Sequence, residues 1–328
     1  MLNIVQKPTL HKTDVSRSTL LFGDCLIESD KIETGSVDLI LTDLPYGTVK
    51  DIRSSPASKT TGLQVCEWDV VIPTEKIMEL ANRILRKNGK MILFCQDPFS
   101  TELKNKAIPN LPFNYSMIWE KDHFANCLLA KKAPLNYFED ILIFSKKACY
   151  EAKHPVKAIF FEIYEKHGKE KCLNAIRTSG RFSSEQSVNF HTSIKFGYGE
   201  GMVFELMVEE LFNHCKRTID IPFEYSYLKE IDEQYKKEYA STFNLWEGNK
   251  YKSNILKYKK DYNGYHPTQK PILLLEDLIK TFSNENDLVV DLTMGSGSTG
   301  VACKNTNRNF IGIEKDENYY NVAVRRCS

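Results

Sequence analysis

Near the end of the chain stands the stretch Leu288-Val289-Val290-Asp291-Leu292-Thr293-Met294-Gly295-Ser296-Gly297-Ser298-Thr299-Gly300. Its apolar start predicts a buried strand, its glycines predict a turn, and the residues from about Thr299 predict a helix. Glycines let a backbone approach a ligand closely, and the N-terminus of a helix attracts negative charge. The stretch therefore predicts a loop that binds a nucleotide-like cofactor, with Asp291 at the end of the strand.

The glycine spacing also matches the dinucleotide pattern Gly-x-Gly-x-x-Gly, so a nicotinamide enzyme is an alternative. Three features count against it. The Asp291 carboxylate would repel a pyrophosphate but suits a cationic amino-acid group, Gly300 falls inside the predicted helix, and only 28 residues follow Gly300. We therefore expect a cofactor with a cationic amino-acid group and ribose hydroxyls. The predicted binding residues are Asp291, Met294, Gly295, Ser296, Gly297, Ser298 and Thr299, with Glu314 accepting from the ribose.

Seven strand-like segments alternate with helical patterns, which predicts a doubly wound, mostly parallel α/β sheet. Because the cofactor loop comes so late, the front of the chain must complete the sheet around it, so the order is permuted. Two helices are predicted at 74–88, between Thr74 as N-cap and Gly89 as C-cap, and at 271–282, with Pro271 in the first turn. The predicted strands are Thr19–Phe22, Val37–Thr42, Lys90–Cys95, Tyr115–Trp119, Asp140–Phe144, Leu288–Leu292 and Phe310–Glu314.

Residues from about 150 to 260 break this alternation with helical patterns at 159–169, 202–215 and 224–239. We interpret them as a mostly helical unit inserted into the sheet domain. The predicted division of the chain is an N-terminal extension over 1–17, one half of the sheet domain over 18–149, the insert over 150–261, and the cofactor-binding half over 262–328.

A second motif, Asp43-Leu44-Pro45-Tyr46, follows an apolar strand and so lies at a carboxyl end of the sheet, where α/β proteins bind ligands. The exocyclic amine of a base is a poor nucleophile because its lone pair is delocalised into the ring. The Asp43 carboxylate and the Leu44 carbonyl can each accept one N–H and free the lone pair. Pro45 stiffens the loop, and Tyr46 is placed to stack on a base that has left the helix. The motif predicts a site for a base amine.

Taken together, the motifs resemble the S-adenosylmethionine-dependent DNA amino-methyltransferases of the permuted β class. In that family the catalytic tetrapeptide comes first, then a target-recognition region, then the cofactor loop. The segment His266-Pro267-Thr268-Gln269-Lys270-Pro271 resembles one that contributes to the family's cofactor pocket, which implicates His266, Thr268 and Lys270. Gly23-Asp24-Cys25-Leu26 resembles its adenine-contacting turn, although Asp24 after Gly23 also fits an ordinary turn. Trp119-Glu120-Lys121 matches the family pattern as well.

The resemblance covers residues 19–147 and 262–326. It implies S-adenosylmethionine as cofactor, double-stranded DNA as substrate, and the insert as the target-recognition region. One position departs from the family's usual Asp-Pro-Pro-Tyr, because Leu44 replaces the first proline; its carbonyl survives, so we expect activity to survive. The leading Asp43 favours adenine N6 over cytosine N4. The alternatives are cytosine N4 as target, a methyltransferase for RNA or protein, and a DNA-binding protein without catalysis.

The overall charge does not predict DNA binding, because the 44 Lys and Arg residues are nearly balanced by 43 Asp and Glu residues. A local basic patch is therefore required. The stretch 250–260 is basic with interleaved tyrosines, although a solvated linker fits it equally well. A loop at 47–67 and the insert supply further basic residues. The candidate DNA-binding residues are Arg53, Lys59, Arg177, Arg181, Lys250, Lys252 and Lys257.

The composition favours a cytoplasmic protein without a membrane span, since no run of about 20 apolar residues occurs. Nine cysteines are scattered without metal-binding spacing, so we expect reduced, mostly buried thiols and no metal. The family resemblance suggests two partners besides DNA, a second copy of the chain and a cognate restriction nuclease.

Overall fold

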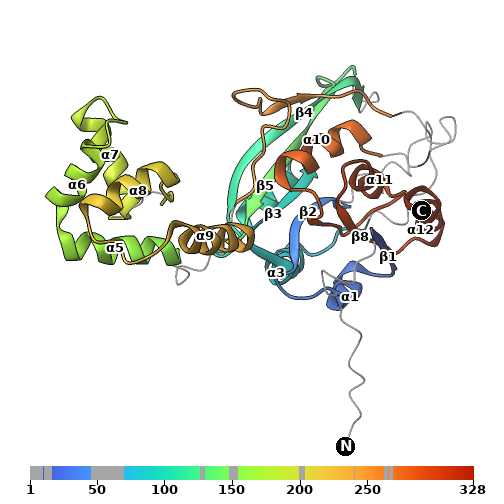
Figure 1. Cartoon of the computed structure of the whole chain (residues 1–328). Helices are drawn as coiled ribbons and strands as arrows, with labels where there is room; N and C mark the ends of the chain where they lie inside the picture. Colours follow the sequence, from blue (N-terminus) through green and yellow to red (C-terminus); the bar gives the residue numbers. More distant parts are fainter. Residues whose placement is uncertain are drawn as a thin grey trace, which may run out of the picture. The chain divides into compact units, whose positions relative to one another are not determined.

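The computed structural model describes residues 10, 17–45, 70–125, 130–147, 154–198, 204–239, 241–261, 265 and 269–328 (Figure 1). The chain divides into two compact units. The sheet unit comprises Met1–Lys147 and Ser241–Ser328, and the helical unit comprises Ala148–Ala240. Each unit is described by itself.

The described part of the sheet unit contains one eight-stranded sheet with the order β1-β8-β7-β2-β3-β5-β4-β6. Neighbouring strands are parallel except at β5, which runs antiparallel to β3 and β4. All seven predicted strands are present and the predicted α/β class is confirmed, but the expected seven-stranded sheet has an eighth strand, β6, that was not predicted. The strands are β1 (Ser18–Phe22), β2 (Val37–Asp43), β3 (Leu85–Cys95), β4 (Phe113–Ala125), β5 (Asn136–Ser145), β6 (Ile255–Lys257), β7 (Leu288–Asp291) and β8 (Asn309–Glu314).

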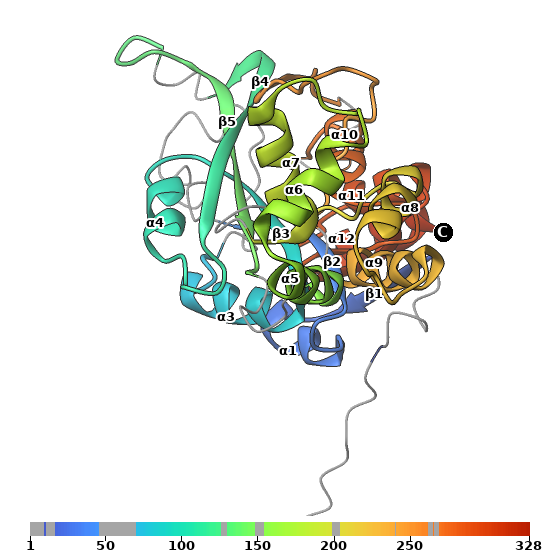
Figure 2. The ribbon, with the colours of Figure 1, turned by 60° about the vertical axis from the view of Figure 1, so that its left-hand side comes forward.

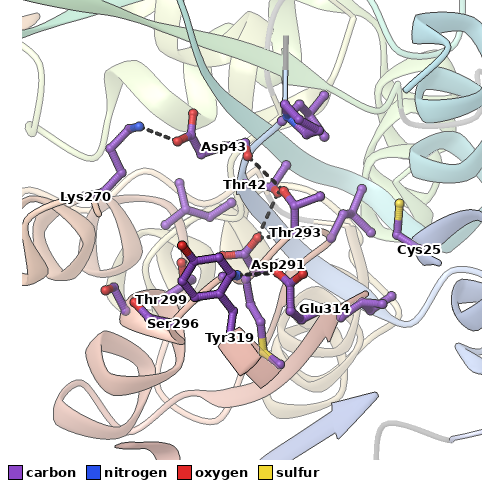
Figure 3. A pocket seen from close by; sticks show the side chains of 18 of the residues that line it. Cys25, Thr42, Asp43, Lys270, Asp291, Thr293, Ser296, Thr299, Glu314 and Tyr319 are labelled. Atoms are coloured by element: carbon purple, nitrogen blue, oxygen red, sulfur yellow. Dashed lines mark hydrogen bonds and ion pairs between the residues drawn. The ribbon is translucent and has the colours of Figure 1, made fainter. Parts of the chain in front are cut away.

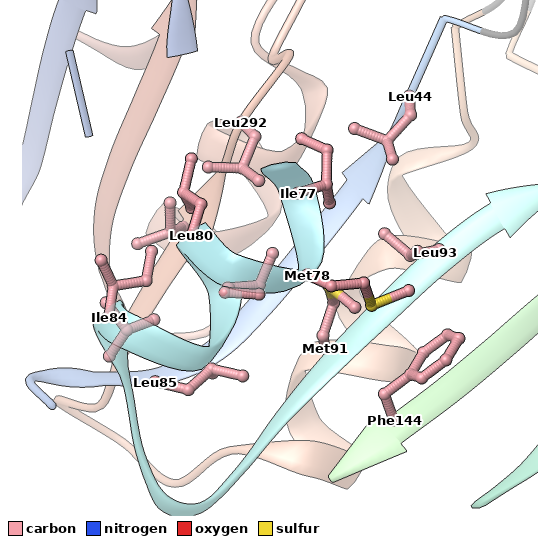
Figure 4. Close-up of a cluster of buried hydrophobic side chains, with 14 of the residues drawn as sticks. Leu44, Ile77, Met78, Leu80, Ile84, Leu85, Met91, Leu93, Phe144 and Leu292 are labelled. Atoms are coloured by element: carbon pink, nitrogen blue, oxygen red, sulfur yellow. The ribbon is translucent and has the colours of Figure 1, made fainter. Parts of the chain in front are cut away.

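The sheet is buried on both faces, and alternate residues of β2 and β3 enter different cores. Ile40 and Leu93 lie in one core with the helices α1 (Cys25–Glu28), α3 (Thr74–Ile84) and α4 (Phe99–Asn105). Helix α1 continues directly into the short 3-10 helix η1 (Ser29–Lys31). Figure 4 shows Ile77 and Met78 of α3 in this core beside Leu93 and Met91. Leu41 and Phe94 lie in the other core with α10 (Ile272–Phe282), α11 (Ser298–Asn305) and α12 (Glu317–Cys327). Burial on both faces explains the continuous apolar strands.

The helix predicted at 74–88 is shorter than expected, and both predicted caps are wrong. It ends at Ile84, because Leu85 already pairs with Val37 in the sheet. Gly89 lies within β3, where an added Cβ would come within 2.9 Å of the Arg86 carbonyl oxygen and 3.1 Å of the Val37 carbonyl oxygen. The glycine is thus required by close strand packing. Pro73 occupies the N-cap position, and the Thr74 hydroxyl instead donates to Glu102 (2.7 Å).

Helix α10 begins one residue later than predicted, with Pro271 at its N-cap position. A proline cannot accept from the first helical N–H groups with its side chain. The Asp261 carboxylate supplies that acceptor, at 2.9 Å from the Ile272 backbone nitrogen. The segment just before the helix is thereby tied to its first turn.

The predicted insert boundary at 261 extends too far, because the helical unit ends at Ala240. Residues 255–257 form β6, which pairs with β4 in the sheet. Trp246 and Lys252 both donate to Asp277 of α10, a carboxylate only 2% exposed. Residues 241–261 therefore pack as part of the sheet unit.

The helical unit has its own apolar core, in which the Phe160 ring meets those of Phe196 and Phe212 at 5.8 and 6.4 Å between centroids. The three predicted helices are present with shifted bounds, and α6 and α7 were not predicted. Figure 2 shows these helices, which are α5 (Pro155–His167), α6 (Lys169–Arg177), α7 (Glu185–Phe196), α8 (Glu209–Thr218) and α9 (Tyr225–Tyr239).

The described cysteines are free and buried, as expected: Cys25, Cys95, Cys172, Cys215, Cys303 and Cys327. Among the described residues, no helix combines the length and the apolar character needed to cross a membrane.

Candidate active site

A pocket opens where β2 and β7 part. Their backbones pair only at Leu39 with Val289 and Ile40 with Val290. The chain leaves β7 toward β8 on one side of the sheet and leaves β2 toward β3 on the other side. The gap between β7 and β2 is therefore the topological switch point, where α/β sheets bind ligands. The pocket encloses about 1160 Å³ of empty space, including its open mouth, and the ends of β2, β7 and β8 line it (Figure 3). Three carboxylates, Asp43, Asp291 and Glu314, thus end three adjacent strands.

Asp291 ends β7 and is only 4% exposed. One carboxylate oxygen accepts from the Thr42 hydroxyl (2.8 Å) and the Thr293 backbone N–H (3.1 Å), and the other accepts from the Thr299 hydroxyl (2.6 Å). Burial raises the pKa of Asp291 to about 6, against the lowering effect of these hydrogen bonds. Its partners are neutral donors, so a cationic ligand would relieve the cost of burying this charge.

The glycine loop folds tightly between β7 and α11. Gly297 has φ of +81°, a left-handed conformation that favours glycine, and stands at the N-cap position of α11. Gly300 lies inside α11, as predicted, and an added Cβ there would come within 2.5 Å of the Cys327 sulfur. This glycine therefore serves helix packing. Arg326 of α12 braces the loop by donating to the Ser296 carbonyl (2.7 Å) and to the Ser298 hydroxyl (3.2 Å).

Glu314 ends β8 and is 9% exposed. One of its oxygens accepts from the Gly295 backbone N–H (2.9 Å) and the other from the Asp316 backbone N–H (2.8 Å), which fixes the carboxylate at the pocket wall. Burial raises its pKa. Asp24 also lines the pocket, but its side chain caps α1 by accepting from the Leu26 N–H (2.8 Å). Asp24 therefore forms the expected turn at the wall of the pocket, and its contact with an adenine stays a prediction.

Asp43 ends β2 at the other side of the pocket. Its backbone carbonyl accepts from the Thr293 hydroxyl (2.9 Å), and its Oδ2 accepts from Lys270. Its Oδ1 is enclosed and has no hydrogen-bond partner in the described part of the chain. The Leu44 side chain is 2% exposed and belongs to the core around α3 (Figure 4). Packing of this side chain therefore anchors the motif where the family's usual proline is absent.

Lys270 was predicted to assist the cofactor, and it does line the pocket. In the structure its ammonium group pairs with Asp43 and lies 3.2 Å from Glu139 of β5. Glu139 also pairs with Lys121 of β4 at 2.7 Å. Burial raises the pKa of Asp43 to about 6, while the charges of Lys270 and Lys121 lower it and the charge of Glu139 raises it. The carboxylate thus sits in a small network of alternating charges.

Five predicted site residues lie outside the described residues: Tyr46, Arg53, Lys59, His266 and Thr268. Of the cofactor candidates that are described, Asp24, Asp291, Met294, Gly295, Ser296, Ser298, Thr299, Glu314 and Lys270 line the pocket. Leu44 and Pro45 line it beside Asp43. Gly297 contributes through the turn of the loop.

The structure corrects one candidate DNA contact. The Lys252 side chain is 8% exposed and is held by Asp277, so it cannot reach a phosphate without breaking a buried ion pair. Lys250 is exposed, and Lys257 is exposed beside Glu120 at 3.1 Å. In the helical unit, Arg177 pairs with Glu185 and Arg181 pairs with Glu210.

Sequence reasoning missed several residues of the site. Thr42 and Thr293 connect the ends of β2 and β7, and the signal for both was present, since each lies within two residues of a predicted site carboxylate. Arg326 could not be found this way, because it lies 28 residues after Ser298, the serine at the start of α11 to which it donates. Phe94, Lys315 and Tyr319 also line the pocket and carry no motif.

The sequence matches the DNA methylase family over residues 37–325. The chain belongs to this family. The Type II methyltransferase M2.LlaDCHI of Lactococcus lactis subsp. cremoris is 34% identical over 325 residues, which cover 99% of this chain and 93% of that relative. The DNA adenine methyltransferase YhdJ of Escherichia coli (strain K12) is 25% identical over 308 residues, or 94% of this chain and 82% of the relative.

A solved structure, the cytosine-N4-specific PvuII DNA methyltransferase, shares the fold with a TM-score of 0.54 at 13% identity. The match covers 99% of this chain and 90% of that one. Membership of the DNA methylase family confirms the expected reaction class, which is S-adenosylmethionine-dependent methylation of DNA. Membership of the family alone leaves the target base open.

Proposed function

We propose that this DNA methylase transfers a methyl group from S-adenosylmethionine to the N6 amine of an adenine flipped out of duplex DNA. The observation that carries the proposal is the row of three carboxylates at the ends of β8, β7 and β2. Adjacent strands are about 4.8 Å apart, so the row spans on the order of 10 Å. That distance suits a ligand held at Glu314 and Asp291 whose reactive end faces Asp43.

The pocket residues fit the methyl donor. Asp291 is a buried carboxylate whose partners are hydroxyls and an amide, so it offers a place for the cationic amino-acid part. Glu314 and the glycine loop suit the ribose, and Asp24 lies where the resemblance expects the adenine. When bound, S-adenosylmethionine supplies an activated methyl group. The residues assigned to holding it are Asp24, Asp291, Met294, Gly295, Ser296, Gly297, Ser298, Thr299, Glu314 and Lys270. His266 and Thr268 are assigned to it by the family resemblance alone.

The protein's part in the chemistry is to prepare the amine. Asp43 Oδ1 and the Leu44 carbonyl each accept one N–H of the target amine, which draws the lone pair away from the ring and directs it toward the donor. The transfer would break the bond between the donor sulfur and the methyl carbon and leave its electron pair on sulfur. The Asp43 carboxylate would stabilise the positive charge that develops on the amine nitrogen. Tyr46 is assigned to stacking on the flipped base, and the base would return to the helix after one proton has passed from the methylated nitrogen to water.

Adenine is proposed over cytosine for two reasons. The leading Asp43 favours an N6 amine, and a relative aligned over 94% of this chain is named as an adenine methyltransferase. The name "Type II methyltransferase" of another relative supports a restriction–modification setting with a cognate nuclease. A homodimer rests on the family resemblance alone.

The helical unit is proposed as the target-recognition region. It carries 13 Lys and Arg residues against 15 Asp and Glu residues, so its overall charge gives no general attraction for phosphates. Its role in the proposal is therefore contact with base edges. When DNA binds, Arg177 would leave its ion pair with Glu185 and Arg181 would leave its ion pair with Glu210, and both arginines would then contact DNA. Phosphate contacts are assigned to Lys250 and Lys257, together with Arg53 and Lys59.

Nucleoside mass spectrometry tests the proposal. Unmethylated genomic DNA is incubated with the protein and S-adenosylmethionine, beside matched RNA, and the products are digested to nucleosides. We expect N6-methyladenine from DNA and none from RNA. N4-methylcytosine would keep the mechanism and correct the base, whereas no methylated base from protein that binds the donor would overturn the enzymatic proposal.

A further inference from the structure

A chain of ion pairs lies beside the catalytic carboxylate and comes from three separate elements. Lys270, which precedes α10, contacts both Asp43 Oδ2 and Glu139 Oε2, the latter at 3.2 Å. Glu139 of β5 also accepts from Lys121 of β4 at 2.7 Å through its other oxygen. The side chains of Lys121, Lys270 and Glu139 are 4%, 7% and 10% exposed. Buried charges of this kind are retained only where they are paired.

We propose that Glu139 and Lys270 are positioning residues that fix the Asp43 carboxylate with Oδ1 toward the target amine and keep its surroundings electrically neutral. This inference rests on the proposed function, because it concerns the same site. It assigns Lys270 to the base-amine side of the pocket in addition to the cofactor side.

The orientation follows from which atoms of Asp43 are already engaged. Thr293 holds its backbone carbonyl, and Lys270 holds Oδ2, so two points of the residue are fixed. The enclosed Oδ1 is left without a partner in the described residues. A buried acceptor without a partner is costly, and an incoming N–H donor satisfies it. The site is therefore preorganised for one amine hydrogen at Oδ1.

Neutrality follows from counting the charges around Asp43. Lys270 alone would oppose the positive charge that develops on the amine nitrogen. Glu139 sits between Lys270 and Lys121, so the two carboxylates and the two ammonium groups cancel. An aromatic ring lies against each ammonium group. The Phe94 ring centroid is 5.2 Å from the Lys270 nitrogen, and the Trp119 ring centroid is 5.4 Å from the Lys121 nitrogen. Removing Glu139 would leave a net positive site.

The network should appear in the pH dependence of catalysis. Burial sets the pKa of Asp43 at about 6, the charge of Glu139 contributes to raising it, and the charges of Lys270 and Lys121 lower it. Within the part of the chain that the structure describes, further charged or titratable groups nearby are Asp291 on β7, Cys95 on β3, and Lys260, whose pKa is lowered mainly by burial. Loss of Glu139 must lower the pKa of Asp43, and loss of the Lys270 charge must raise it.

The test compares Glu139→Gln and Lys270→Gln with the natural protein. The pH profile of kcat/KM for DNA is measured with the methyl donor saturating, so that Asp291 is already engaged with the donor and the profile reports the groups that act on the base. We expect the acid limb to move by about one pH unit, downward for Glu139→Gln and upward for Lys270→Gln. Both variants should lose about tenfold or more in rate at pH 7.5. Lys270→Arg, which keeps the charge, should leave the limb close to its natural pH.

A matched control separates positioning from simple stabilisation. Arg86 pairs with Asp38 at 2.6 Å with side chains 14% and 3% exposed, and Asp38 lies on the same strand as Asp43 at its opposite end. Arg86→Gln breaks a comparably buried ion pair, so it should lower the melting temperature without moving the acid limb. Circular dichroism and a cooperative thermal melt verify that each variant is folded.

The outcomes are distinct. Opposite shifts in Glu139→Gln and Lys270→Gln support the inference. Shifts in the same direction, or an unchanged limb in folded variants, overturn it even if the natural protein methylates DNA. Absence of methylation by the natural protein would instead remove the proposed function on which the inference rests.

Discussion

Asp291→Asn separates the two roles assigned to the carboxylate at the end of β7. The substitution keeps the size of the side chain and one oxygen that can accept from Thr42 or Thr299. It removes the negative charge that is proposed to hold the cationic part of the methyl donor. We therefore expect opposite effects on folding and on donor binding.

The structure gives the size of the effect on folding. Burial raises the pKa of Asp291 from 3.8 to about 6, which corresponds to about 3 kcal/mol. Because the folded pKa lies above the unfolded one, this group's contribution to stability is fully present below about pH 4 and is lost as pH rises through 6. An asparagine does not ionise and escapes this loss. At pH 7 the free energy of unfolding of the donor-free variant should be higher by about 1 to 3 kcal/mol, less any hydrogen bond it fails to make.

Donor binding should move the other way. Removing one partner of a buried, hydrogen-bonded charge pair costs about 2 to 5 kcal/mol, so the affinity for S-adenosylmethionine should fall at least 30-fold, as 1.4 kcal/mol is tenfold. Urea unfolding at pH 7 and pH 4.5 without donor measures stability, and titration calorimetry measures affinity. The stability difference should fall to about 1 kcal/mol at pH 4.5, because the folded Asp291 is neutral there while the unfolded carboxyl group is still mostly ionised.

Two results would refute this reasoning. A donor affinity within about threefold of the natural protein would remove Asp291 from the donor site, since the expected loss is about 2 kcal/mol or more. A variant that is less stable than the natural protein at pH 7, and equally so at pH 4.5, would mean that Asp291 acts through its hydrogen bonds and that its burial carries no net charge cost.

Three further predictions concern the same unit. Leu44→Ala should lower the free energy of unfolding by about 2 to 4 kcal/mol in urea titrations, because the side chain is 2% exposed in the α3 core, and the methylation rate should fall with it; an unchanged stability would argue against the anchoring role. Gly300→Ala should lower the free energy of unfolding by about 1 to 3 kcal/mol, since the added Cβ would lie 2.5 Å from the Cys327 sulfur and 2.8 Å from the Phe310 ring. An unchanged melting temperature would contradict this prediction. Donor binding at pH 5.5 should release protons, because the bound cation lowers the raised pKa of Asp291. Calorimetry in buffers of different ionisation enthalpy measures this release, and identical binding heats in all buffers would contradict it.

The strands were predictable because sheets covered on both faces need continuous apolar runs, and β2, β7 and β8 supply them. Strand β6 was missed because it is three residues long, lies among lysines, and exists only through pairing with β4, more than 130 residues earlier. Gly89 was misread because a glycine at a helix end and a glycine under a crossing backbone look alike in sequence. Local patterns therefore predicted elements, while tertiary contacts decided their ends.

The candidate site divides in the same way. Asp43, Asp291 and the glycine loop follow strands, so a sequence motif could place them at one edge of the sheet. Glu139 carried no signal in the sequence, and Lys121 was noted only as part of a family pattern without a role. Each gains its role where the β4–β5 pair meets Lys270. Lys252 was assigned to DNA because basic residues are usually exposed, and the buried Asp277 that binds it is 25 residues away.

The measurement that tests the central claim most directly is single-turnover methylation by Asp43→Asn in parallel with donor titration. The claim is that Asp43 acts on the amine of the base while the methyl donor is held elsewhere. We expect donor affinity to stay within about threefold and the rate of N6-methyladenine formation to fall by about 10² to 10³, the usual cost of losing one preorganised charge-stabilising group. A rate within about fivefold of the natural protein, or a loss confined to donor affinity, would contradict the account.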